Sequence, residues 1–230
     1  MKILVCGCSY FTQDTNYPGT HFSELLAKKL NAELIPLAAA GASNFIIRLQ
    51  IQESLTIKPD LVILGFTSPE RMEFKLYEHA KYNAYNGVHN IKYRPNSPYI
   101  KEQYACIGSM PIPSLMYTDN YKDLFKLYLT SPLHIPAVSH HKELFIAESG
   151  LNLLQDNNIP FVYTIGGLGP DLNILKNYNA HKIPDIGNPW IYQGDEAKYQ
   201  NERAYHTSDK RQIDLLYIWL KKIKELYNFV

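Results

Sequence analysis

The sequence has little cysteine, no excess of charge of either sign and no long run of apolar residues. Its three cysteines, an odd number without paired spacing, argue against the disulfide framework of a small secreted protein. The 23 Lys and Arg against 22 Asp and Glu leave a net charge of +1, which lacks the basic field that nucleic-acid binding requires. No stretch approaches the roughly 18 apolar residues of a membrane span, and the start does not resemble a signal peptide. We therefore expect a cytoplasmic protein that binds neither nucleic acid nor membrane.

Tyrosine is the residue in surplus, at 18 of 230 residues. Many tyrosines lie between residues 75 and 118 among Asn, Pro, Gly and Lys, with no clear period. They are Tyr77, Tyr82, Tyr85, Tyr93, Tyr99 and Tyr104. So long an irregular stretch is typical of a functional lid or a binding insertion. Its rings could stack on sugars or could form a small aromatic core of their own.

Short apolar runs alternate with segments of helical spacing along the first 65 residues. The apolar runs predict strands at 2–6, 32–36 and 60–65, with helices at 20–30 and after the turn at 41–44. Further on, the pattern predicts a strand at 159–165 and helices near 119–130, at 141–155 and from 209 onward. Strands and helices that alternate with short joints indicate a parallel sheet with right-handed crossovers.

We therefore predict an α/β fold, a three-layer α/β/α sandwich with a parallel, flavodoxin-like sheet of about five strands. At 230 residues the chain fits a single domain, with the Tyr-rich insertion at about 75–118 and added helices at about 119–157. Two local signals mark helix starts. Ser68 as N-cap followed by Pro69 and Glu70 predicts a helix after the third strand. Asp209 can cap the last helix, with Gln212 reaching back.

In an open parallel sheet, ligands bind beyond the carboxyl ends of the strands. The residues expected there are Gly7-Cys8-Ser9, Gly41 to Asn44, Thr67-Ser68, Gly166-Gly167 and, on the loop before the last helix, His206. A serine hydroxyl becomes a useful nucleophile when a base such as histidine takes its proton. Acyl transfer also needs N–H groups aimed at the oxyanion, and glycine lets a main-chain N–H come that close.

These blocks resemble, in order and spacing, those of the SGNH (GDSL-like) hydrolases. Gly7-Cys8-Ser9 matches the family's Gly-Asp-Ser, and Gly41 matches the glycine of the second block. Gly65-Phe66-Thr67-Ser68 stands at the family's Gly-x-Asn-Asp, and Arg203-Ala204-Tyr205-His206 stands at its Asp-x-x-His. The segment 67–74, which begins Thr-Ser-Pro-Glu-Arg, is similar to a variant third block in SGNH-like proteins of tailed phages and bacteria.

The resemblance implies that Ser9 is the nucleophile and His206 the general base. It also implies an oxyanion hole formed by the main-chain N–H groups of Ser9 and Gly41. Thr67 replaces the family's Asn as the third donor, and Asn44 is an alternative donor. Neither a metal nor an organic cofactor is implied.

Arg203 stands where the family has the aspartate that orients the histidine. Glu202, Asp195 or Asp209 could supply that carboxylate, or a main-chain carbonyl could hold the ring. The loss of such a carboxylate lowers turnover about 10,000-fold in a Ser-His-Asp triad. The sequence therefore does not decide which group orients the His206 ring.

Two functions fit these features. The first is a serine esterase or O-deacetylase acting on a small-molecule or glycan ester, for example an acetylated sugar. The second is a catalytically degenerate module with a binding or structural role, for example in association with a phage particle, that uses the Tyr-rich insertion as its contact surface. We expect Cys6 and Cys8 to be buried, with Cys8 as a less favoured nucleophile. His134, His140, His141 and Glu143 match no zinc spacing and suggest a solvated helix face.

Overall fold

The computed structural model describes residues 1–13, 17–39, 42–69, 71–76, 89–93, 103–107, 136–165, 175–183 and 209–227. The helix expected near 119–130 lies outside these ranges. The same is true of several predicted site residues, namely Gly41, Gly166, Gly167, Asp195, Glu202 and His206. The main chain of Asp209 is described as part of a helix.

The central sheet is parallel and is built from β1 (Lys2–Cys6), β2 (Glu33–Pro36), β3 (Leu61–Gly65) and β7 (Phe161–Thr164). Its strand order is β2-β1-β3-β7, the flavodoxin-like order that the sequence predicts, and the described residues form four of the about five strands expected. A parallel bridge between Tyr163 and Lys182 continues the pairing beyond β7.

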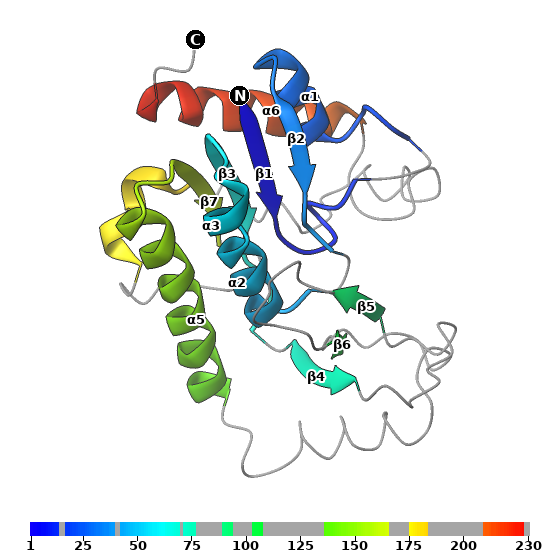
Figure 1. Ribbon diagram of the computed structural model, residues 1–230, viewed down its shortest axis with the longest axis vertical. Coiled ribbons are helices and arrows are strands. Elements are labelled where there is room, and N and C mark those ends of the chain that lie inside the picture. The colour runs from blue at the N-terminus through cyan, green and yellow to red at the C-terminus, as the bar shows by residue number, and fades with distance from the viewer. Residues whose placement is uncertain are drawn as a thin grey trace.

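Helices cover both faces of this sheet (Figure 1). α1 (Phe22–Lys29) and α6 (Asp209–Leu226) pack on one face. α2 (Asn44–Gln52) and α5 (Pro136–Asp156) pack on the other, and the short α3 (Ser54–Ile57) continues from α2. A 3₁₀ helix, η2 (Lys176–His181), follows β7. The three-layer α/β/α sandwich is therefore confirmed. Among the described residues, no helix combines the length and the apolar character needed to cross a bilayer.

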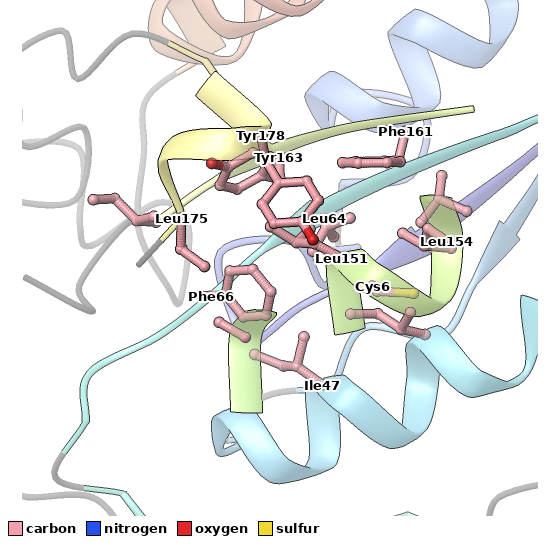
Figure 2. Packing of buried hydrophobic residues seen from close by; sticks show 14 of the residues in the cluster. Cys6, Ile47, Leu64, Phe66, Leu151, Leu154, Phe161, Tyr163, Leu175 and Tyr178 are labelled. Carbon is pink, nitrogen blue, oxygen red and sulfur yellow. The ribbon is translucent and has the colours of Figure 1, made fainter. Parts of the chain in front are cut away.

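β1, β3 and β7 are buried on both faces, as their continuous apolar runs predict, whereas the residues of edge strand β2 are half-buried or exposed. Ile3 and Val5 of β1 pack with α1 and α6, whereas Leu4 and Cys6 pack with α2 and α5. Figure 2 shows the second of these clusters, in which Cys6 lies among side chains from β3, α2, α5 and β7. The alternation follows from the two-residue period of a strand, and it gives the sheet a separate core on each face.

A second, antiparallel sheet follows β3. It consists of β4 (Met72–Leu76), β5 (His89–Tyr93) and β6 (Gln103–Ile107) in the order β4-β6-β5. Figure 1 places this sheet on the side toward which β1 points. The described part of the Tyr-rich insertion therefore includes two strands, which the missing period of its sequence did not predict.

The predicted helix start at Ser68 is wrong. Residues 66–69 form a loop and Met72 begins β4, which pairs residue by residue with β6 from Met72–Ile107 to Leu76–Gln103. A capping signal is local, whereas strand pairing depends on a partner far away in the sequence, and here the pairing prevails. Gln212 Oε1 accepts a hydrogen bond from Phe22 N, 2.7 Å away on α1.

Candidate active site at the carboxyl edge of the sheet

Ser9 lies in a tight turn directly beyond β1. Phe11 N donates to Cys8 O at 2.9 Å, and Thr12 N donates to Ser9 O at 3.3 Å, so the chain folds back at once. Ser9 is half-buried, whereas Cys8 beside it is buried. The turn therefore presents the serine at the carboxyl end of a central strand, where the sequence predicts it.

Phe11 fixes this turn against the strands. Its side chain is 1% exposed and packs edge-on against Phe22 and Trp219. A Cβ added to Gly7 would lie 2.8 Å from Phe11 Cβ, and one added to Gly65 would lie 2.1 Å from Phe11 Cε2. Both motif glycines therefore make room for a ring that crosses the ends of β1 and β3.

Thr67 lies just beyond β3 and is buried. Asn44, the first residue of α2, accepts a hydrogen bond from Thr67 N at 2.7 Å and donates to Thr67 O at 3.0 Å. Both main-chain groups of Thr67 are thus bonded by one side-chain amide. The Thr67 N–H is consequently engaged, which leaves the hydroxyl as the group of Thr67 that could donate to a ligand.

Gln50, six residues farther along α2, binds the loop after β1 in the same way. Its Oε1 accepts from Gly7 N at 2.7 Å, and its Nε2 donates to Gly7 O at 3.3 Å. Gln50 and Asn44 are both fully buried. No motif in the sequence pointed to Gln50. Its signal was a polar residue that continues the apolar stripe of Ile46 and Ile47 at helical spacing.

The loop after β2 joins the same edge through two further contacts. Ala39 N donates to Gly7 O at 3.1 Å, and Arg71 Nη1 donates to Ala42 O at 2.9 Å. Ser43 caps α2 by accepting a hydrogen bond from Ile46 N. The loops after β1, β2 and β3 are therefore bonded to one another or to α2.

His21 is a second residue that the sequence analysis missed. It caps α1 and is buried, with Nδ1 2.7 Å from Ser23 Oγ and Nε2 3.0 Å from Tyr10 O. A carbonyl only accepts, so Nε2 carries the hydrogen in this contact. The Ser9 turn is thus tied to α1 through Tyr10 and to α2 through Gly7.

Cys6 and Cys8 are free and buried, and their burial was predicted. Burial, with a smaller contribution from the charge of Glu53, raises the pKa of the Cys6 thiol far above its usual range. Glu143 is also buried, so it does not lie on a solvated helix face as expected, although His141 is exposed. Among the described residues, no group of three or more His, Cys, Asp or Glu side chains is arranged to hold a metal ion.

The structure thus brings Ser9, Thr67 and Asn44 to one edge of the sheet. Gly41, His206, Glu202 and Asp195 lie outside the described residues, and so does the side chain of Asp209. Their places in the site remain predictions from the sequence.

Comparison with known proteins gives similarity in fold. No family model matches the sequence, and no curated protein is significantly similar to it. Among solved structures, the chain is similar to TesA, with a TM-score of 0.52, 12% identity, and coverage of 99% of this chain and 100% of that one.

Two esterases are also similar in structure. One is a carbohydrate esterase whose active site has divergent catalytic and non-catalytic binding functions, with a TM-score of 0.51, 11% identity, and coverage of 99% of this chain and 69% of that one. The other is the psychrotrophic esterase EstA from Pseudoalteromonas sp., with a TM-score of 0.47, 13% identity, and coverage of 98% and 97%. The similarity to TesA and to the carbohydrate esterase, at 12% and 11% identity, concerns the fold alone, an α/β sandwich that this chain shares with them.

Proposed function

We propose that the protein is a serine ester hydrolase that removes an acyl group, such as acetyl, from a small ester or a carbohydrate. The observation that carries the proposal is the position of Ser9, half-buried in a tight turn at the carboxyl end of central strand β1. In a sheet of this order, that edge is where ligands bind. The fold shared with TesA and with a carbohydrate esterase supports the same choice.

In the proposed mechanism, Ser9 Oγ attacks the acyl carbon while His206 takes the hydroxyl proton. The tetrahedral intermediate collapses, the C–O bond to the alcohol breaks, and His206 returns the proton to the leaving oxygen. Water then attacks the acyl-enzyme by the same route, which releases the acid and restores Ser9. Glu202, Asp195 or Asp209 would orient the imidazole.

The oxyanion would be held by the N–H groups of Ser9 and Gly41, with the Thr67 hydroxyl as a third donor. The loss of one oxyanion donor lowers turnover by roughly 100- to 1,000-fold in well-studied cases. Because a threonine hydroxyl reaches less far than an asparagine amide, we expect slow turnover. The second sheet, on the side toward which β1 points, supports a role for the Tyr-rich insertion in substrate choice.

A fluorophosphonate probe tests the proposal, since it reacts covalently with an activated serine. We expect stoichiometric labelling of the wild-type chain, and none of Ser9→Ala or His206→Ala. Ser149→Ala is the control, because it removes an exposed hydroxyl from α5, outside the candidate site, and should label normally. Folded protein whose Ser9 stays inert would overturn the proposal.

A second experiment concerns the substrate of the labelled enzyme. Acetate release from acetylated xylan, compared with hydrolysis of p-nitrophenyl acetate, would distinguish a carbohydrate esterase from an esterase of simple esters.

A second candidate is a binding or structural module on the same fold, for example on a phage particle. Two substitutions favour it, since Thr67 and Arg203 stand where the resembled family has its asparagine and aspartate. This candidate predicts no labelling but retained binding of acetylated oligosaccharides, measurable by calorimetry with Ser9→Ala and wild type alike.

A further inference from the structure

Two buried amides on α2 bind the main chain at the two places from which the reactive groups are presented. Gln50 bonds both main-chain groups of Gly7, two residues before Ser9. Asn44 bonds both main-chain groups of Thr67. Each amide offers one acceptor and one donor, which is the pair that a neighbouring strand would offer.

Both sites lie where a neighbouring strand has ended. Val5 O accepts from Leu37 N and Ala38 N, and Gly7 O accepts from Ala39 N, so both residues turn their carbonyls toward the chain that follows β2. Gly7 N, in contrast, is bonded to Gln50.

The end of β3 shows the same arrangement. Phe66 N donates to Thr164 O, whereas Thr67, the next residue, is bonded to Asn44. The two amides thus extend the hydrogen bonding of the sheet past its last residues.

We propose, on the basis of the proposed function, that Gln50 and Asn44 are positioning residues. Gln50 fixes the Gly7 peptide and thereby the direction of the Ser9 turn and its N–H. Asn44 fixes the Thr67 main chain and thereby the start of its side chain. Both act from a single rigid helix, so the two loops are held in one frame. Acyl transfer depends on such alignment, because a displacement of about 1 Å can lower the rate roughly 100-fold.

Gln50→Met tests this proposal, since it keeps the length of the side chain and removes both hydrogen bonds. We expect kcat on p-nitrophenyl acetate to fall about 100-fold, with KM nearly unchanged. The labelling rate at Ser9 should fall in parallel. Asn44→Leu should act in the same direction through Thr67.

Two controls separate positioning from a general loss of stability. Gln52→Met changes a glutamine of the same helix that bonds Arg48, and it should leave kcat unchanged. Tyr227→Phe removes hydrogen bonds from the main chain of Phe161, at the start of β7 and away from the site. It should lower the melting temperature without a change in kcat. An equal fall in kcat for Gln50→Met and Tyr227→Phe would overturn the proposal.

Hydrogen–deuterium exchange gives a result that does not depend on activity. In Gln50→Met, the peptide that spans residues 7–12 should exchange at least tenfold faster, whereas in Tyr227→Phe it should not change. Unchanged exchange there in Gln50→Met would overturn the positioning role even in an active enzyme. A wild-type chain that is inert to the probe would instead refute the proposed function, and faster exchange in Gln50→Met would still support the hold on the turn.

Discussion

The two ends of the parallel sheet are both closed by side chains that bond the main chain, but they serve different parts of the protein. At the carboxyl end, Gln50 and Asn44 bond Gly7 and Thr67. At the amino end, Tyr227 Oη accepts from Phe161 N and donates to Phe161 O, both at 3.0 Å. The chemistry is the same at both ends. Only at the carboxyl end do these hydrogen bonds hold loops that carry residues proposed to react. Substitutions there should therefore lower activity, whereas substitutions at the amino end should lower stability alone.

The amino end shows what such bonds do where no reaction is proposed. Phe161 begins β7, the last strand in the order of the sheet, and an open strand edge invites pairing with another chain. The Tyr227 hydroxyl covers its two main-chain groups, and His181 stacks on the Phe161 ring with centroids 4.5 Å apart. The hydrogen bonds at the amino end therefore cover the edge of β7, whereas those at the carboxyl end fix the loops after β1 and β3.

Phe11→Ala should give the largest loss of stability and of labelling. The Phe11 ring packs against Gly7 at the end of β1 and Gly65 at the end of β3, and it connects both to the core. Truncating a buried phenylalanine typically lowers the free energy of unfolding by about 3–5 kcal/mol. The Ser9 turn should lose its packing at the same time, so labelling should fall too. Urea unfolding and probe labelling measure the two losses.

Gly65→Ala provides the check on this contact. In the wild-type background, its Cβ would lie 2.1 Å from Phe11 Cε2, and overpacking of this kind typically costs about 1–3 kcal/mol. In the Phe11→Ala background the same substitution should cost much less, because the ring is gone. Additive losses in the double variant would contradict the proposed contact.

Tyr227→Phe should have a smaller effect, confined to the amino end. Leaving the buried Phe161 N–H without a partner costs about 1–3 kcal/mol, whereas Phe161 O keeps its contact with His181 Nδ1 at 3.2 Å. Thermal unfolding should show the loss, while labelling of Ser9 stays at the wild-type rate. A fall in labelling without a change in stability would mean that the two ends are coupled through the sheet.

Much of this architecture could be predicted from the sequence, because burial on both faces leaves a simple pattern. The runs at 2–6 and 60–65 are continuous and apolar, and both became strands of the central sheet. The order of the motifs then placed Ser9 and Thr67 beyond these strands. These predictions required only the periods of strands and helices and the rule that carboxyl ends share an edge.

The features that the sequence did not predict depend on contacts between residues far apart in the chain. Ser68, Pro69 and Glu70 carry a good helix signal, yet Met72 begins a strand because Ile107 lies opposite. Gln50 was missed for a related reason, since a glutamine in a helix is usually exposed. The residues around Gln50 give no sign that its side chain bonds the main chain of Gly7, 43 residues earlier. Partners of this kind emerge only when the sheet has been assembled.

His181 offers the subtlest test of the comparison, through pH. Its Nδ1 lies 3.0 Å from Tyr227 Oη, and burial lowers the pKa of the ring below its usual range, with a further lowering by the charge of Lys222 and a partial offset by Phe161 O. The unfolded chain therefore binds the proton more readily than the folded one. Stability should be complete above about pH 6.5, the ordinary histidine pKa, and should decline as the pH falls through the window down to the lowered pKa.

Urea unfolding between pH 5 and 8 measures this slope in the wild type and in His181→Gln, which cannot titrate. The variant should be less stable at pH 8, because it loses the stack on Phe161, but the difference between the two proteins should shrink as the pH falls. A constant difference across the range would show that His181 does not sense the proton. Hydrogen exchange should locate the acid-sensitive step in β7, while the peptide spanning residues 7–12 keeps its protection, because the bonds of Gln50 to Gly7 involve no titratable group.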